Sequence, residues 1–295
     1  MPISRREFLG SVAVTAIACA LPPRPARSSH LKVGYASITW GGRDLLAINE
    51  IAALGYAGIQ VRANMFAQFR NQPSALRDIL AQHELALVAL SSGDVIIDPA
   101  AEAKMLAEHA ARARFVHDVG GAFLQVTDAG VTGRPVTEDD CTRLAGLLTE
   151  IGKRSADVGI PLAYHPHMGT IGEKPDDADR ILAAADAQYV KLLLDVAHYQ
   201  QGGGDPAVAI RRHKDRLAFL HLKDVEAVST APGYRFVELG RGHVNLDAVF
   251  TALRDVSFDG WAVVELDSVP DPSRTPNDSA AINKRYLESH GFALR

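Results

Sequence analysis

Side chains able to bind a metal ion or carry a proton recur directly after short apolar runs in the second half of this 295-residue sequence. Four groups follow one another along the chain: His165-Pro166-His167, Asp195 with His198, His221 with Lys223, and Glu265. A carboxylate or an imidazole at the end of an apolar run is costly to bury unless another group pairs with it. A divalent cation is the simplest partner common to all four groups, so their placement predicts a metal site.

The residue types narrow the choice of metal. One aspartate, one glutamate and several histidines would give a mixed nitrogen and oxygen ligand set, which suits Mn²⁺, Co²⁺, Fe²⁺ or Zn²⁺ better than Ca²⁺. We expect Mn²⁺ or Co²⁺, with Zn²⁺, Fe²⁺ or Mg²⁺ as alternatives. The alternative to metal binding, for any one of these residues, is that it is a buried polar group whose hydrogen bonds are all made to neighbouring protein groups. The histidines on predicted helices or tails, His30, His83, His109, His117 and His290, are expected to be solvated.

Eight apolar runs, each bounded by glycine, proline or polar residues, predict the strands of a buried parallel sheet. They cover residues 31–37, 56–61, 85–90, 122–127, 160–165, 190–196, 217–223 and 261–266. Helix-like segments lie between them, and those at 44–54, 100–119 and 142–158 each stop at a glycine. This alternation predicts an α/β fold, a single (β/α)8 TIM barrel over residues 31–295, whose strands would end at one common mouth.

An open doubly wound sheet is the alternative architecture. No Gly-x-Gly-x-x-Gly motif opens a helix after the first apolar run, which disfavours a dinucleotide-binding domain. The formal charge is −4 and the basic residues form no run, so nucleic acid is not expected as a partner.

The first thirty residues predict a twin-arginine export signal and a linker. Arg5-Arg6 precede Phe8-Leu9 and an apolar run over residues 10–21, and a proline-rich stretch follows. The apolar run is shorter than the roughly 20 residues that span a bilayer, so no stable membrane anchor is expected. The predicted partner is the twin-arginine export machinery, and the predicted location is the periplasm or another exported compartment.

The strand ends resemble those of the xylose isomerase-like TIM barrel superfamily of sugar isomerases, epimerases and dehydratases, with the nearest likeness to inosose (2-keto-myo-inositol) dehydratases. The segments that carry the likeness are YHPHMGT (164–170), LLDVAH (193–198), HLKD (221–224), GRGHVN (240–245) and GWAVVE (260–265).

The resemblance implies a divalent metal held by a Glu, an Asp, a His and a second Glu. Asp195, His221 and Glu265 occupy the last three of these positions. His165 stands where many relatives have the first glutamate, so either His165 or Glu173 is the first ligand, or three protein ligands suffice. The sequence departs again at Gln60, where relatives often have glutamate.

The resemblance also implies abstraction of a proton next to the carbonyl of a keto-sugar, keto-glycoside or keto-cyclitol. Elimination, epimerisation and isomerisation share the resulting enediolate, and the histidine-rich mouth favours elimination because a leaving oxygen needs an acid. The expected acids and bases are His167 and His198, with Lys223 as an electrostatic or proton-transfer group. The residues expected to contact the carbohydrate substrate are Trp40, Gln60 and Arg241.

Two other functions remain open at this point. A sugar isomerase or epimerase would use the same chemistry, whereas an exported sugar-binding protein would use none. An exported location favours a keto-sugar or keto-glycoside over inosose, and a homo-oligomer is compatible with the sequence.

Overall fold

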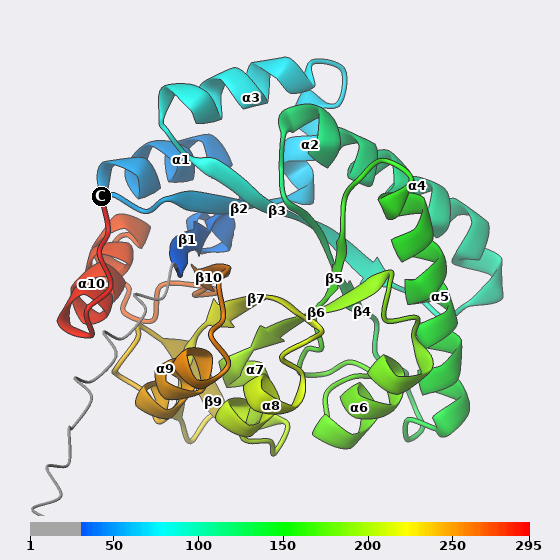
Figure 1. Ribbon diagram of the computed structural model, residues 1–295. Coiled ribbons are helices and arrows are strands. Elements are labelled where there is room, and N and C mark those ends of the chain that lie inside the picture. The colour runs from blue at the N-terminus through cyan, green and yellow to red at the C-terminus, as the bar shows by residue number, and fades with distance from the viewer. Residues whose placement is uncertain (1–30) are drawn as a thin grey trace, which may run out of the picture.

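The computed structural model describes residues 31–295, so the predicted export signal lies outside the described residues. Eight parallel strands close into a barrel in the order β1-β10-β7-β6-β5-β4-β3-β2, and helices surround it (Figure 1). The strands are β1 (Lys32–Ala36), β2 (Gly58–Arg62), β3 (Ala86–Val95), β4 (Phe123–Asp128), β5 (Leu162–Tyr164), β6 (Val190–Asp195), β7 (Leu217–Leu222) and β10 (Trp261–Val264). The predicted (β/α)8 barrel is confirmed, and each strand overlaps its apolar run.

The helices follow the strands in the expected alternation. They are η1 (Ser37–Trp40), α1 (Asp44–Ala53), α2 (Ala63–Phe69), α3 (Pro73–Gln82), α4 (Pro99–Val119), α5 (Glu138–Ala156), α6 (Pro175–Ala184), α7 (Val196–Gln201), α8 (Pro206–Arg212), α9 (Leu246–Asp255) and α10 (Pro276–Ser289). Helix α5 begins four residues before the predicted start, because Thr137 and Asp140 form a capping box. In that box the Asp140 carboxylate accepts from the Thr137 N–H at 2.9 Å.

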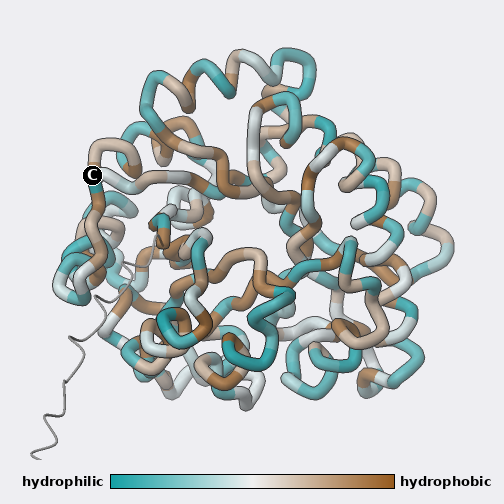
Figure 2. The backbone as a smooth tube through the Cα atoms, viewed as in Figure 1, coloured by the Kyte–Doolittle hydropathy of each residue, from teal (hydrophilic) through white to brown (hydrophobic). Residues whose placement is uncertain are grey.

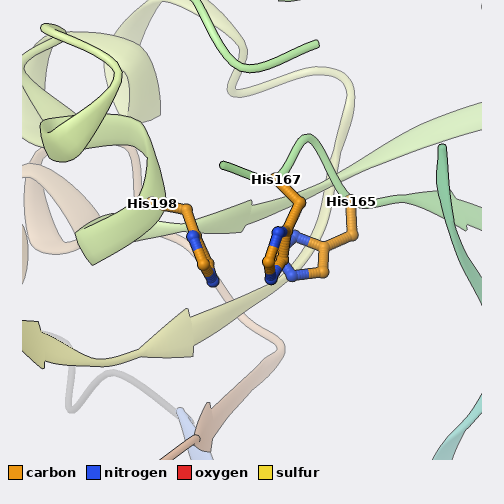
Figure 3. Close-up of side chains that lie close together, drawn as sticks. All are labelled: His165, His167 and His198. Carbon is orange, nitrogen blue, oxygen red and sulfur yellow. The ribbon is translucent and has the colours of Figure 1, made fainter. Parts of the chain in front are cut away.

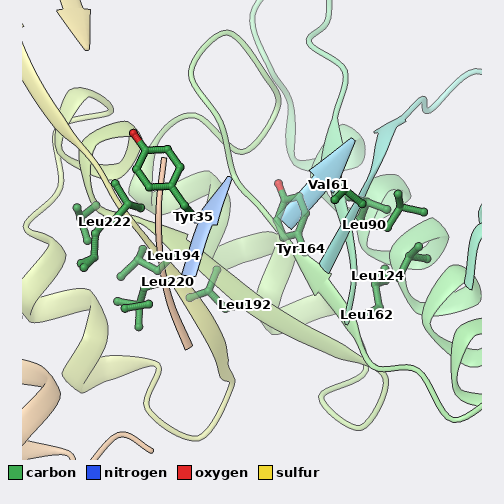
Figure 4. Close-up of a cluster of buried hydrophobic side chains, with 14 of the residues drawn as sticks. Tyr35, Val61, Leu90, Leu124, Leu162, Tyr164, Leu192, Leu194, Leu220 and Leu222 are labelled. Carbon is green, nitrogen blue, oxygen red and sulfur yellow. The ribbon is translucent and has the colours of Figure 1, made fainter. Parts of the chain in front are cut away.

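The pleat of the strands divides the apolar side chains into two layers. One layer packs between the strands and the helices and includes Leu192, Leu194, Leu220 and Tyr164 (Figure 4). The other, smaller layer includes Ala163, Leu193 and Phe219 and fills the inside of the barrel. Hydrophobic colouring accordingly follows the strands, while the outer turns of the helices are largely hydrophilic (Figure 2). An inward-facing side chain two residues beyond this inner layer, toward the end of its strand, therefore points into the mouth of the barrel.

A short antiparallel hairpin, β8 (Asp224–Ala227) with β9 (Tyr234–Val237), follows β7 and was not predicted. The Asp224 carboxylate is buried and accepts hydrogen bonds from the backbone N–H groups of Val225, Gly240, Gly242 and Val244 at 2.9–3.0 Å. Asp224 therefore ties the hairpin and the loop after it to the end of β7. Within residues 31–295, no helix combines the length and apolarity needed to cross a membrane.

Candidate active site

The barrel pleat brings the predicted strand-end residues to one place. On β6 and β7 the inward positions alternate with outward ones, so Asp195 follows Leu193 inward and His221 follows Phe219. Asp195 pairs with His221 in the register between these strands. On the neighbouring strands, His165 and Glu265 lie two residues beyond the inward side chains of Ala163 and Val263.

Three buried atoms in this cluster have no hydrogen-bond partner among the described residues: His165 Nδ1, Asp195 Oδ2 and His221 Nδ1. His221 Nδ1 lies 3.4 Å from Asp195 Oδ2 and 3.3 Å from Glu265 Oε1. Buried polar atoms without partners are rare in folded proteins and often mark a bound ion or water. The closeness of Asp195 Oδ2 and His221 Nδ1, with a nitrogen of His165 within 4.8 Å of an oxygen of Asp195, points to a missing shared partner.

The cluster fits a divalent cation. Ligand atoms about 2.1 Å from a tetrahedral metal lie ~3.4 Å from one another, close to the two spacings around His221 Nδ1. His165, Asp195, His198 and Glu265 also each bring one ligand atom to within 4.8 Å of the others. Two imidazoles and two carboxylates form a donor set of intermediate hardness, suited to first-row divalent metals. Two further histidines lie beside His221. Nδ1 of His165 has no hydrogen-bond partner among the described residues, whereas Nε2 of His198 already lies within hydrogen-bond distance of Lys223 Nζ, so His165 is the better candidate ligand.

Gln60 orients His221 for this role. Its side-chain N–H donates to Ser91 Oγ at 3.0 Å, which turns its carbonyl oxygen toward His221 Nε2 at 2.9 Å. A carbonyl oxygen only accepts, so Nε2 carries the proton and Nδ1 faces the carboxylates. Gln60 does line the cavity, as a substrate contact would, but both ends of its amide are engaged by protein. Metal-ligating histidines commonly have such an acceptor behind them.

The second oxygen of Asp195 has a structural role. Its Oδ1 accepts from the backbone N–H groups of Ala197 and His198, both at 2.9 Å, and so caps helix α7. This cap fixes the carboxylate plane and leaves Oδ2 facing the cluster.

Charge in the cluster is distributed unevenly. Burial alone would raise the pKa of Asp195 and Glu265, but neighbouring groups hold the pKa of both carboxyls well below the usual range: His198 and Lys223 act on Asp195, and His221 and Lys223 act on Glu265. Burial alone would lower the pKa of His221, and the two carboxylates raise it to about 9, so the ring carries a proton on both nitrogens until a bound cation would displace the one on Nδ1. Burial lowers the pKa of His165 well below its usual value, and the neighbouring His221 adds to this effect. His165 is therefore a neutral imidazole able to bind metal.

Lys223 supplies a buried positive charge beside the same carboxylates. Its Nζ lies 2.5 Å from Asp267 Oδ1, 3.1 Å from Glu265 Oε1 and 3.7 Å from Asp195 Oδ2. Burial disfavours the ammonium, yet these three carboxylates raise the pKa of Lys223 above its ordinary value. The Phe236 ring of the hairpin lies 4.1 Å from Nζ and covers it.

His167 and His198 differ in what their ring nitrogens can do. The two rings lie with their centroids 3.7 Å apart and their planes tilted by 39°, beside His165 (Figure 3). His198 Nε2 lies 3.1 Å from Lys223 Nζ, and an ammonium only donates, so this nitrogen accepts. His167 Nδ1 lies 2.8 Å from the carbonyl oxygen of Met168, so it donates and leaves Nε2 as the free basic nitrogen. His167 is also the more exposed of the two.

A cavity of about 260 Å³ opens beside the candidate metal ligands His165 and Glu265. Its lining includes His165, His167 and Glu265 from the predicted set. Polar residues that we did not predict complete it: Arg62, Ser91, Asp94, Gln125, Thr127 and Asp267. Two of these left a signal in the sequence, because Gln125 interrupts an apolar run and Asp267 repeats the inward spacing two residues after Glu265.

Three predicted residues lie elsewhere. The Trp40 side chain is buried and donates to Glu50 Oε2 at 2.6 Å, so it is part of the core and not a platform at the mouth. Arg241 is exposed, pairs with Glu238 at 3.5 Å and lines a different cavity. Glu173 accepts from the Gly169 N–H at 2.7 Å outside the cluster, so His165 and not Glu173 stands beside Asp195. These positions correct our expectations for Trp40, Arg241 and Glu173.

Comparisons with known proteins agree with this geometry. The family described as xylose isomerase-like TIM barrel matches residues 48–290. The inosose dehydratase of Lacticaseibacillus casei is 26% identical over 296 aligned residues, which cover 88% of this chain and 97% of the relative. Among solved structures, the IolI protein with a bound zinc atom superposes with a TM-score of 0.74 at 18% identity and covers 88% of this chain and 97% of its own. The 3-keto-D-glucoside 4-epimerase of E. coli gives a TM-score of 0.69 at 18% identity, with 88% and 99% covered. At these identities the two structures show a shared fold.

Proposed function

Because this chain belongs to the xylose isomerase-like TIM barrel family, we propose that it is a divalent-metal-dependent enzyme acting on a keto-sugar, keto-glycoside or keto-cyclitol. The proposed reaction removes the proton next to the carbonyl and then eliminates a β-oxygen substituent, as a carbon–oxygen lyase. The observation that carries this proposal is the pair of unpartnered buried atoms Asp195 Oδ2 and His221 Nδ1, 3.4 Å apart, beside His165 and Glu265, which line the cavity. The activity named for the curated relative, inosose dehydratase, supports the same type of reaction.

The residues that would hold the metal are His165, Asp195, His221 and Glu265. When bound there, a divalent cation supplies positive charge that polarises a carbonyl and stabilises negative charge developing beside it. Zinc in the IolI structure supports a metal in a barrel of this shape, without deciding which metal this chain uses.

His167 is the proton carrier in this mechanism. Its Nδ1 donates to the Met168 carbonyl, so Nε2 of the neutral ring is free to take the C–H proton of a substrate in the cavity. The electron pair of the C–H bond then forms the carbon–carbon double bond as the β C–O bond breaks. The His167 imidazolium returns its proton to the leaving oxygen, so that water or an alcohol departs.

Lys223 and His198 act on the charge of the site. Lys223 stays an ammonium and places a positive charge next to Glu265 and Asp267, at the floor of the cavity. Lys223 holds the His198 ring, which packs against His167 and so restricts the position of the proton carrier. We assign His198 to positioning, since its Nε2 is engaged.

Export completes the proposal. Residues 1–30 would direct the folded protein through the twin-arginine machinery to the periplasm, where its substrate would be a carbohydrate.

The test combines metal analysis with isotope exchange. The purified protein is expected to hold close to one divalent metal per chain, and the metal-loaded protein should incorporate deuterium next to the carbonyl of 3-keto-glucosides or inosose in deuterated water. Formation of an unsaturated ketone, followed by ultraviolet absorbance and NMR, would support elimination. Exchange without elimination would assign an epimerase or isomerase, and protein that binds no metal and exchanges no proton would refute the enzyme proposal in favour of a sugar-binding role.

A further inference from the structure

We propose that a second cavity beside the active site binds the second ring of a glycoside, so that the substrate is a keto-glycoside and not a free keto-sugar or keto-cyclitol. This inference rests on the proposed function and selects among the substrates that it allows. The cavity lies over the ends of β4 and β5, where no strand-end prediction placed a substrate contact.

The second cavity adjoins the first, and the two share three lining residues. Asp94, Thr127 and His167 line both, and Thr127 Oγ1 donates to Asp94 Oδ1 at the boundary. The proton carrier His167 therefore stands between the two cavities. The volumes are about 260 and 350 Å³, the first just below and the second at the lower end of the range of roughly 300–1,000 Å³ for small-molecule sites. Each cavity is suited to one sugar ring, and a two-ring ligand would extend past His167.

The lining of the second cavity favours a neutral, hydroxylated ring. Its acidic side chains are Asp94 and Asp128, of which Asp128 is buried and already hydrogen-bonded to protein, and among the described residues that line the cavity there is no lysine or arginine. An anionic group such as a phosphate would meet like charge there, whereas sugar hydroxyls can donate to a carboxylate. The cavity also lacks Phe, Tyr and Trp in the lining described, so recognition would depend on hydrogen bonds.

The floor of the second cavity is built from backbone held in place by Asp128. A side chain at Gly130 would bring its Cβ within 2.3 Å of the Gly169 carbonyl oxygen, so the two loops meet there in direct contact. Asp128 is buried and accepts from the Tyr164 hydroxyl at 2.8 Å and from the Ile171 N–H at 2.6 Å. These bonds fasten the loop after β5 to the end of β4. The cavity is therefore formed before any ligand binds.

The test uses unreactive sugars and a variant that fills the second cavity. Ala129 lines this cavity and not the first, so Ala129→Trp should block it. Val131→Trp is the matched control, because Val131 lies two residues on and lines the next cavity along the loop instead. Affinities of the metal-loaded full chain for glucose, cellobiose and maltose are measured by calorimetry, with circular dichroism to verify folding and Ala129→Leu as a milder variant.

We expect at least one disaccharide to bind wild type ten or more times more tightly than glucose. Ala129→Trp, or Ala129→Leu if the larger variant does not fold, should reduce this gain to about twofold, and Val131→Trp should keep it. Equal affinity for all three sugars, no measurable binding, a gain that survives filling the cavity, or a gain lost in Val131→Trp would each overturn the second-ring site.

Catalysis gives an independent readout. The 3-keto forms of the same sugars are compared by deuterium exchange. Exchange with both the keto-sugar and the keto-glycoside at equal kcat/KM would retain the enzyme and overturn the second-ring site. Preferential disaccharide binding without exchange on any ketone would retain the second-ring site and refute the proposed reaction.

Discussion

Replacing Lys223 by methionine removes a buried positive charge from the centre of the candidate metal site. Lys223 is fully buried, and its Nζ lies 2.5 Å from Asp267 and 3.1 Å from Glu265. Removing one partner of a buried ion pair costs about 3–5 kcal/mol, because the other charge stays buried without compensation. Methionine fills most of the space of the lysine stem, so little of the loss would come from packing. The metal-free variant should therefore have a free energy of unfolding lower by about 3–5 kcal/mol.

The same substitution should tighten metal binding. Lys223 Nζ lies 3.7 Å from Asp195 Oδ2 and contacts Glu265, so a cation held by these two carboxylates is repelled by the ammonium. Two unit charges about 4 Å apart interact by about 4 kcal/mol at an effective dielectric constant near 20. Relief of only a third of that repulsion, about 1.4 kcal/mol, lowers the Kd tenfold.

Both effects are measurable on metal-stripped protein. Urea unfolding gives the free energy of unfolding, and calorimetric titration with zinc chloride gives the Kd. Lys191→Met is the control, because Lys191 lies on the adjacent β6 and donates instead to the backbone carbonyl of Ala187. It should change stability by less than about 0.5 kcal/mol and leave the Kd unaltered. Weaker zinc binding by Lys223→Met would refute the reasoning and show that Lys223 holds Glu265 in place for the metal.

Three further predictions concern other residues. His167→Asn should lower deuterium exchange by about 10²–10⁴-fold with metal content unchanged, and full exchange in this variant would remove His167 from the mechanism. Burial lowers the pKa of His109 to about 4, so the unfolded chain binds a proton at this histidine more readily than the folded one. The free energy of unfolding should therefore keep its full value above pH 6.5 and fall by up to about 1.4 kcal/mol per pH unit as the pH drops from 6.5 toward 4. His109→Gln should flatten this dependence in urea unfolding across that range, and equal slopes for both proteins would contradict it. Replacing both Arg5 and Arg6 by lysine should stop export of a reporter fused to residues 1–30, whereas continued export would contradict a twin-arginine signal.

His109 also shows where pattern-based reasoning fails. It lies on helix α4 and was expected to be solvated, but it is buried and its Nδ1 lies 2.7 Å from Ser92 Oγ. A polar residue on an amphipathic helix can face inward when a specific partner meets it, and that partner comes from β3, 17 residues earlier in the chain.

The fold was predictable because it depends on local pattern. Strands buried on both faces must be apolar throughout, so the eight runs were visible without knowledge of their neighbours. The hairpin β8–β9 escaped detection, since its strands have four residues each and their half-buried pattern is too short to detect. Trp40 was misplaced for a related reason, because the glycines after it indicated a loop while its Glu50 partner lies ten residues away on α1.

The sequence by itself determined the barrel and the four strand ends that carry imidazole, ammonium and carboxylate groups, because parallel strands of a barrel must end at one mouth. Only the tertiary structure decided which of these groups meet and in what protonation pattern. His165 rather than Glu173 stands beside Asp195, Gln60 turns His221 toward the carboxylates, and Met168 leaves one nitrogen of His167 free. Such choices depend on ångström-scale distances between residues far apart in the chain, which no local pattern of residue types records.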